Sequence, residues 1–143
     1  MFFRKKIKGN LLKYYIPAQI SGCLLGVMFA NVFFEHSLLE LSTKNRDGLH
    51  IFVSEIVATF GLIFIIFATL KDGKTIVAIS VATYISAGYW FTSSTSFANP
   101  AVSLARTFTD SFTGINYLNT PTYILAEFIG LILAAYILRI IYK

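Results

Sequence analysis

Charged residues are scarce in this sequence, since they make up 13% of its 143 residues while 56% are hydrophobic. A soluble domain of this size carries about twice that share of charge. The charges also cluster between long apolar stretches that show no polar face, which the helices of a soluble bundle would need. The composition therefore excludes a soluble bundle and predicts an all-α integral membrane protein in contact with the lipid bilayer.

Cysteine and metal-binding patterns are equally sparse. Cys23 is the only cysteine, so no disulfide can form within the chain. His36 and His50 lie near acidic residues but lack the spacing of metal ligands. The sequence contains no nucleophile with a neighbouring base and no phosphate-binding loop. It thus predicts no metal site, no cofactor and no enzymatic activity.

Four apolar segments are long enough to cross a membrane as helices. About 20 apolar residues, each rising about 1.5 Å, span the roughly 30 Å of hydrocarbon in a bilayer. The apolar run after Lys8 is too long for a typical signal peptide and is interpreted as the first span. We interpret residues 1–143 as one transmembrane domain. The predicted spans are Asn10–Phe34, Ile51–Leu70, Thr75–Phe91 and Thr122–Ile141.

The basic residues predict the orientation of these spans. With four spans both termini lie on one side of the membrane, and nine of the twelve basic residues fall on that side. Basic residues favour the cytoplasmic side. We therefore predict a multi-pass protein of the cell membrane with cytoplasmic termini, and assign the net charge of +5 to topology and not to nucleic-acid binding. The nine residues are Arg4, Lys5, Lys6, Lys8, Lys13, Lys71, Lys74, Arg139 and Lys143.

Small residues recur at every fourth position in two of the spans, which places them on one helix face. In lipid, such faces let helix backbones approach closely. We therefore predict tight helix packing along both stripes. The first stripe comprises Ala18, Gly22, Gly26 and Ala30, and the second comprises Ala126, Gly130 and Ala134.

The segment before the last span contains a helix-start signal. Asn99 is a favoured N-cap, and Pro100 suits the first helical position, where a missing N–H costs nothing. A helix from Pro100 to about Thr109 is about 15 Å long, which is half the hydrocarbon thickness. We expect this half-helix to enter the membrane from outside and to stop at mid-depth. Thr92–Ser96 would return as extended chain along a wet cavity.

A half-helix of this kind has the properties of a pore element. It directs its positive dipole end and its free N–H groups into the cavity, where the potential opposes cations and protons. The Asn99 amide adds a donor for the oxygen of a passing water or hydroxyl. The segment therefore predicts a passive pore for small uncharged solutes. The alternative, which the triplet Asn99-Pro100-Ala101 alone favours, is a capped helix in an external loop.

These residues resemble a known family. Asn99-Pro100-Ala101 after a Ser/Thr-rich run resembles the second signature loop of the aquaporin, or major intrinsic protein, family. Residues 55–59, with Glu55 and Thr59 at their ends, resemble the Glu-x-x-x-Thr of the family's fourth span, and residues 15–19 resemble its third span. The resemblance implies a partial aquaporin-like fold of four spans and one re-entrant half-helix. It implies a second chain that supplies the two spans and the half-helix that are missing, or a homo-oligomer. An inverted copy of this chain is disfavoured as the missing half, because the nine-to-three bias of basic residues fixes one orientation.

The resemblance also implies a selectivity filter formed by Val102, Ser96 and Ala87. Water-selective members have an arginine at the position of Val102, so the valine implies a wider and less polar filter, as in a bacterial branch partly linked to arsenite. Arg106 is not expected to replace that arginine, because it lies about one turn further toward the outer surface and extends to the interface. Ala87 fits a role in helix packing equally well.

Two carboxylates lie inside predicted spans, where a lone charge is costly and marks a candidate functional site. By the resemblance, Glu55 supports the re-entrant loop together with Thr59 by accepting hydrogen bonds from backbone N–H groups. Glu127 also lies about one turn inside its span, and extension toward the outer interface is at least as good an interpretation as a functional role.

The leading hypothesis is therefore a passive channel, or channel subunit, for water and small uncharged solutes such as glycerol or arsenite. One alternative is a proton-coupled secondary transporter that uses Glu55 as its proton site. The other is a non-conducting fragment of a split channel gene.

Overall fold

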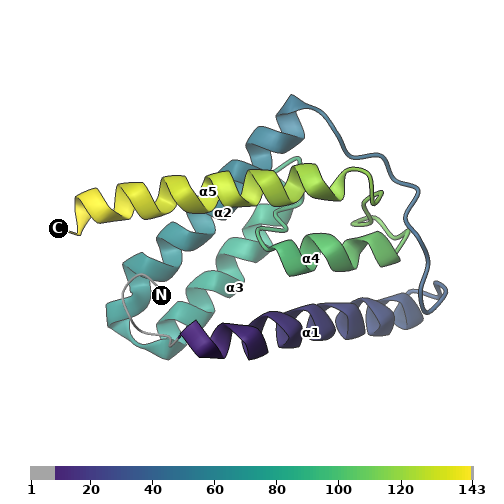
Figure 1. The fold of residues 1–143 in the computed structure, drawn as a ribbon, viewed down its shortest axis with the longest axis horizontal. Coiled ribbons are helices and arrows are strands. Elements are labelled where there is room, and N and C mark those ends of the chain that lie inside the picture. The colour runs from purple at the N-terminus through teal and green to yellow at the C-terminus, as the bar shows by residue number, and fades with distance from the viewer. Residues whose placement is uncertain (1–8, 143) are drawn as a thin grey trace.

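The computed structural model describes residues 9–142, which form five α-helices joined by loops (Figure 1). This part of the chain contains no β-strand, so the predicted all-α class is confirmed. Short 3-10 turns precede α1, follow α2 and follow α4, the last of them being η4 (Arg106–Phe108). The helices are α1 (Leu12–Phe33), α2 (Leu49–Thr69), α3 (Lys74–Phe91), α4 (Pro100–Ala105) and α5 (Thr120–Ile141).

Three segments are long and apolar enough to cross a membrane, namely Gly9–Phe33, Leu49–Asp72 and Thr120–Ile141. They correspond to three of the four predicted spans. The other predicted span is α3, whose 18 residues rise about 27 Å. It does not qualify by length and composition, because serine, threonine and tyrosine interrupt its apolar residues. Its role as a span remains a prediction.

The helices run back and forth along one direction. The start of α1, the turn between α2 and α3 and the end of α5 lie at one end of the bundle, and the α1–α2 loop lies at the other (Figure 1). We call the latter the loop end. This arrangement is the one that an even number of crossings requires. Of the basic residues in the topology prediction, Arg4, Lys5, Lys6, Lys8 and Lys143 lie outside the described residues.

The most extensive helix contact joins α2 and α5. Its closest point is Gly130, where an added Cβ would lie 2.6 Å from the carbonyl oxygen of Ile56 and 2.9 Å from Thr59 Cβ. Ala126 and Ala134, one turn to either side, are completely buried. The predicted tight packing along this stripe is therefore confirmed, because only small side chains fit between the two backbones.

The matching stripe on α1 has no such partner. Ala18, Gly22 and Gly26 are exposed, and a Cβ added to either glycine would meet no atom within 4 Å in the described chain. The predicted tight packing is therefore wrong for α1 within residues 9–142. The physical reason is that α1 packs against α4 on a different face, with its buried Val27 and Asn31.

Helix α4 lies between α1 and α5. It begins near the middle of the bundle's long dimension and runs toward the loop end (Figure 1). Asn31 Nδ2 of α1 donates to the carbonyl oxygen of Phe108 at 3.1 Å, and Ser42 N of the α1–α2 loop donates to that of Thr107 at 2.9 Å. With η4 included, the half-helix covers Pro100–Phe108, which matches the predicted start and ends one residue before the predicted Thr109.

Candidate functional site

The site is centred on Asn99, which caps α4. Asn99 Oδ1 accepts a hydrogen bond from Ala101 N at 2.9 Å, and its carbonyl oxygen accepts from Val102 N and Ser103 N. Because Pro100 has no N–H, these bonds leave no free backbone N–H in the first turn. The expectation of free N–H groups at this helix end is therefore wrong. The donor that remains is Asn99 Nδ2, which has no hydrogen-bond partner among the described residues.

The chain before Asn99 is folded more sharply than expected. Thr92 is extended, but Thr95, Ser96 and Ala98 have left-handed φ values of 64°, 52° and 50°. Residues other than glycine in this conformation cost about 1–3 kcal/mol each and persist where the surroundings impose it. The predicted extended return is thus wrong for its second half, and hydrogen bonds from neighbouring helices hold the turn.

Helix α2 supplies the first of these contacts. The Glu55 side chain is completely buried, and its Oε1 accepts a hydrogen bond from Ala98 N. One residue earlier, Ser54 Oγ accepts from Ser93 N at 2.9 Å. This placement of Glu55 is the one that the loop-support hypothesis requires. Because a buried N–H without an acceptor is costly, the carboxylate stabilises the left-handed turn.

Helix α5 supplies a second carboxylate. Glu127 Oε1 accepts from Asn99 N at 3.1 Å and from Ser103 Oγ at 2.6 Å, and the side chain is 2% exposed. Of the two interpretations that the sequence left open for Glu127, extension to the interface is therefore wrong. A signal was present in the sequence, since Tyr123 and Gly130 stand four residues before and three after Glu127, on the same buried helix face.

Glu55 and Glu127 together bind two consecutive peptide N–H groups, those of Ala98 and Asn99, from opposite helices. We call this arrangement the carboxylate clamp. Thr59 does not take part in it, because it lies at the α2–α5 crossing beside Gly130 and its buried hydroxyl has no hydrogen-bond partner in residues 9–142. In this structure Glu55 and Glu127 hold the end of the loop next to Asn99, and Ser54 holds its start at Ser93.

The three filter candidates have different surroundings. Ser96 is 3% exposed and packs against α3 at Gly88, where an added Cβ would lie 2.7 Å from Ser96 Cβ. Ala87, the neighbour of Gly88, is exposed. Val102 is half-buried on α4 and packs against a group of buried side chains that we call the Phe97 cluster. The fold thus places Ser96 beside the α3 segment that carries Ala87. The Phe97 cluster comprises Phe97, Ile115 and Tyr123.

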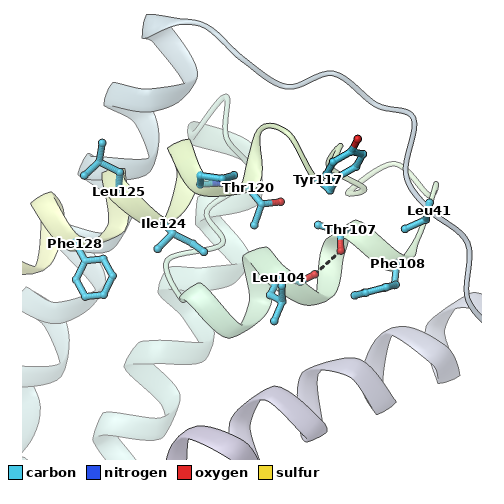
Figure 2. Close-up of a pocket in the computed structure, with 10 residues that line it drawn as sticks. Leu41, Leu104, Thr107, Phe108, Tyr117, Thr120, Ile124, Leu125 and Phe128 are labelled. Carbon is cyan, nitrogen blue, oxygen red and sulfur yellow. Dashed lines mark hydrogen bonds between the residues drawn. The ribbon is translucent and has the colours of Figure 1, made fainter.

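A separate groove of about 650 Å³ lies between α4 and α5 (Figure 2). Leu104 of α4 and Ile124 and Phe128 of α5 line it, and the buried Thr120 hydroxyl at its edge has no hydrogen-bond partner in the described chain. Neither Asn99 nor any filter candidate is among its lining residues. The groove is therefore an apolar surface beside the site and not the site itself.

Comparison with known proteins gives one relative. The aquaglyceroporin AqpS of Rhizobium meliloti (strain 1021) is 42% identical over 125 residues, which are 87% of this chain and 54% of AqpS. The chain belongs to the aquaporin family. This aquaporin chain spans about half the length of the curated relative that it matches. No family model and no solved structure matches it.

Proposed function

We propose that this aquaporin chain forms part of a passive channel for water and small uncharged solutes. The observation that carries the proposal is the state of Asn99, whose Oδ1 and backbone N–H are both held by hydrogen bonds while Nδ2 stays free. A fixed amide donor at the inner end of a half-helix binds a passing oxygen without any chemical step. The relative AqpS is described as an aquaglyceroporin, which supports the same class of solute.

The filter favours solutes larger than water. Val102 offers no hydrogen-bond donor and packs its methyl groups against the Phe97 cluster, so α4 does not project a long side chain at this position. We propose that Ser96 and Ala87 complete this side of the filter, and that glycerol-sized polyols and uncharged arsenite pass through it.

A vesicle-swelling assay on the chain assembled with the unmatched part of AqpS tests the filter. Val102→Arg should reduce glycerol permeability by about tenfold, corresponding to about 1.4 kcal/mol, and should reduce water permeability less. Val102→Leu is the matched control, because it changes the volume of the side chain without adding charge, and it should stay close to wild type. Equal glycerol permeability in Val102→Arg and wild type would show that Val102 does not limit the pore.

We further propose that another aquaporin segment completes the pore around this single domain, either from a second chain or from a homo-oligomer. Two apolar surfaces support the idea: the open stripe of α1 and the groove between α4 and α5. The single half-helix also covers only about half of the membrane thickness. Flux from the chain alone should be negligible and should appear when the unmatched part of AqpS is co-expressed. Strong solute flux from the chain alone would contradict this proposal.

The topology proposal places both termini in the cytoplasm, because the positive-inside bias of the sequence is nine to three. A reporter domain that is active only in the cytoplasm should be active when it is fused to either terminus. The proton-coupled alternative is disfavoured, because Glu55 is completely buried and its Oε1 is engaged by Ala98 N. Solute flux that follows a proton gradient would support that alternative instead.

A further inference from the structure

The guanidinium group of Arg46 lies close to the chain before α4, a helix that contains no charged residue. Arg46, in the α1–α2 loop, donates from Nη1 to Thr95 Oγ1 at 3.1 Å. Its Cζ atom lies 5.9 Å from the ring centroid of Phe97, within the range of a cation–π contact. Thr95 and Phe97 are the two neighbours of Ser96, the filter candidate. The positive charge of Arg46 is therefore held beside Thr95, Ser96 and Phe97, which we call the filter segment, although Arg46 is 49 positions before Thr95 in the sequence.

The backbone of the loop fixes this position. Arg46 N donates to Asn119 Oδ1 at 3.0 Å, and Asn116 N donates to the carbonyl oxygen of Lys44 at 2.8 Å. Both partners belong to the segment just before α5. Because the loop is tied to this segment at Lys44 and at the backbone of Arg46 itself, the arginine side chain starts from a fixed point and loses less conformational entropy when it contacts Thr95.

The Arg46 guanidinium also has N–H groups that make no hydrogen bond within residues 9–142. Within residues 9–142 the ion pair found is between His36 and Glu40, so Arg46 forms no direct ion pair in this range, and it interacts with the buried Glu55 only through space. Its side chain makes one hydrogen bond, to Thr95, and a guanidinium has several further N–H groups. Arg46 is half-buried whereas Thr95 is 4% exposed, so the guanidinium covers the threonine on the side that solvent reaches.

We propose that Arg46 is a specificity-determining residue of the channel: it supplies, from the α1–α2 loop, the cation that Val102 does not supply from α4. It donates hydrogen bonds to the oxygen atoms of passing uncharged solutes and repels cations at the loop end of the pore. This inference rests on the channel function proposed above. Arg106 does not share the role, because its Nη2 donates to Tyr89 Oη at 3.3 Å, on the outer part of α3.

The test measures glycerol and potassium permeability of vesicles that contain the full chain together with the unmatched part of AqpS. Arg46→Gln should raise potassium permeability relative to glycerol about tenfold, the effect of removing a unit charge about 10 Å from the ion at an effective dielectric constant of about 20. Arg46→Lys should restore the exclusion of potassium because it restores the charge. Arg106→Gln is the matched control and should behave as wild type.

A second variant distinguishes the effect of losing the positive charge from the effect of misfolding. In a Cys23→Ser background, Arg46→Cys should leak potassium until a cationic thiol reagent restores the positive charge on the assembled protein, while a neutral reagent of similar size should have no effect. Unchanged potassium-to-glycerol ratios in Arg46→Gln, or equal effects of the two reagents, would overturn the role of Arg46. Absence of glycerol flux in the wild-type assembly would instead overturn the proposed channel function, and this inference with it.

Discussion

The small-residue faces of α5 and α1 have the same four-residue spacing but opposite surroundings. On α5, Ala126 and Ala134 are completely buried and Gly130 leaves no room for a Cβ against Ile56. On α1, Gly22 and Gly26 meet no atom within 4 Å of an added Cβ. The spacing alone therefore indicates that a helix can be approached closely. Whether a neighbour is present depends on the rest of the fold.

The comparison also explains how the site is held. The close approach of α5 to α2 lets Glu127 and Glu55 accept from the consecutive N–H groups of Asn99 and Ala98, because no bulky side chain keeps the two helices apart. At its glycines, the corresponding face of α1 contacts no other helix in the described chain. It remains available for the further segment proposed above.

The largest expected effect is that of filling the α5 face. Gly130→Leu should destabilise the protein by about 3 kcal/mol or more, because the side chain would overlap the Ile56 carbonyl. Gly26→Leu, the matched change on α1, should alter the stability of the chain alone by less than about 0.5 kcal/mol. Unfolding by denaturing detergent in micelles measures both. Equal losses would contradict the difference between the two faces.

The same pair sharpens the proposal for a partner segment. Gly26→Leu should weaken assembly with the unmatched part of AqpS although it leaves the chain folded, since a bulky residue prevents close backbone approach. Co-purification in mild detergent measures this. Unimpaired assembly would mean that the α1 face stays in contact with lipid.

The carboxylate clamp should have an intermediate effect. Glu55→Gln and Glu127→Gln should each cost about 2 kcal/mol, because each places an amide donor at a buried Oε2 position that has no hydrogen-bond partner in the described chain. Glu35→Gln, at an exposed position in the loop, is the control and should be close to neutral. Thermal unfolding in detergent gives the comparison. A Glu127→Gln protein as stable as wild type would show that α5 does not support the loop.

The smallest effect concerns the exposed side of the loop end. Hydrogen bonding by Thr43 N, and then by the Thr43 and Ser42 hydroxyls and the Lys44 charge, lowers the pKa of Asp110 below its ordinary 3.8. Because the folded-state pKa is lowered, the stabilisation is present above pH 3.8 and is lost as the pH falls through the lowered value. The protection factor of the Thr43 amide, which is the ratio of its intrinsic to its observed exchange rate, should therefore fall under acid conditions in wild type. In Asp110→Asn the protection factor should be low already at neutral pH and should not change with acid, and an identical pH profile of the protection factor in both would contradict the link.

Signals from neighbouring residues were sufficient to predict the helices. Asn99-Pro100 predicted the start of α4 to the residue, because capping chemistry depends on neighbours in the chain. The lengths of the apolar runs predicted α1, α2 and α5 within a few residues, since crossing a bilayer is a matter of length and hydropathy. The left-handed turn before Asn99 was not predictable in this way, because it contains no glycine to mark it.

The sequence by itself determined that this chain is a helical membrane protein with a half-helix capped by Asn99, because hydropathy and capping act over a few turns. Only the tertiary structure decided which groups surround that cap. Glu127 turned inward because the close contact at Gly130 buries its helix face. Arg46 reached Thr95 because the loop end folds back over the filter segment. Contacts between residues so distant in the chain leave no local pattern, since they arise only when packed helices bring the two segments together.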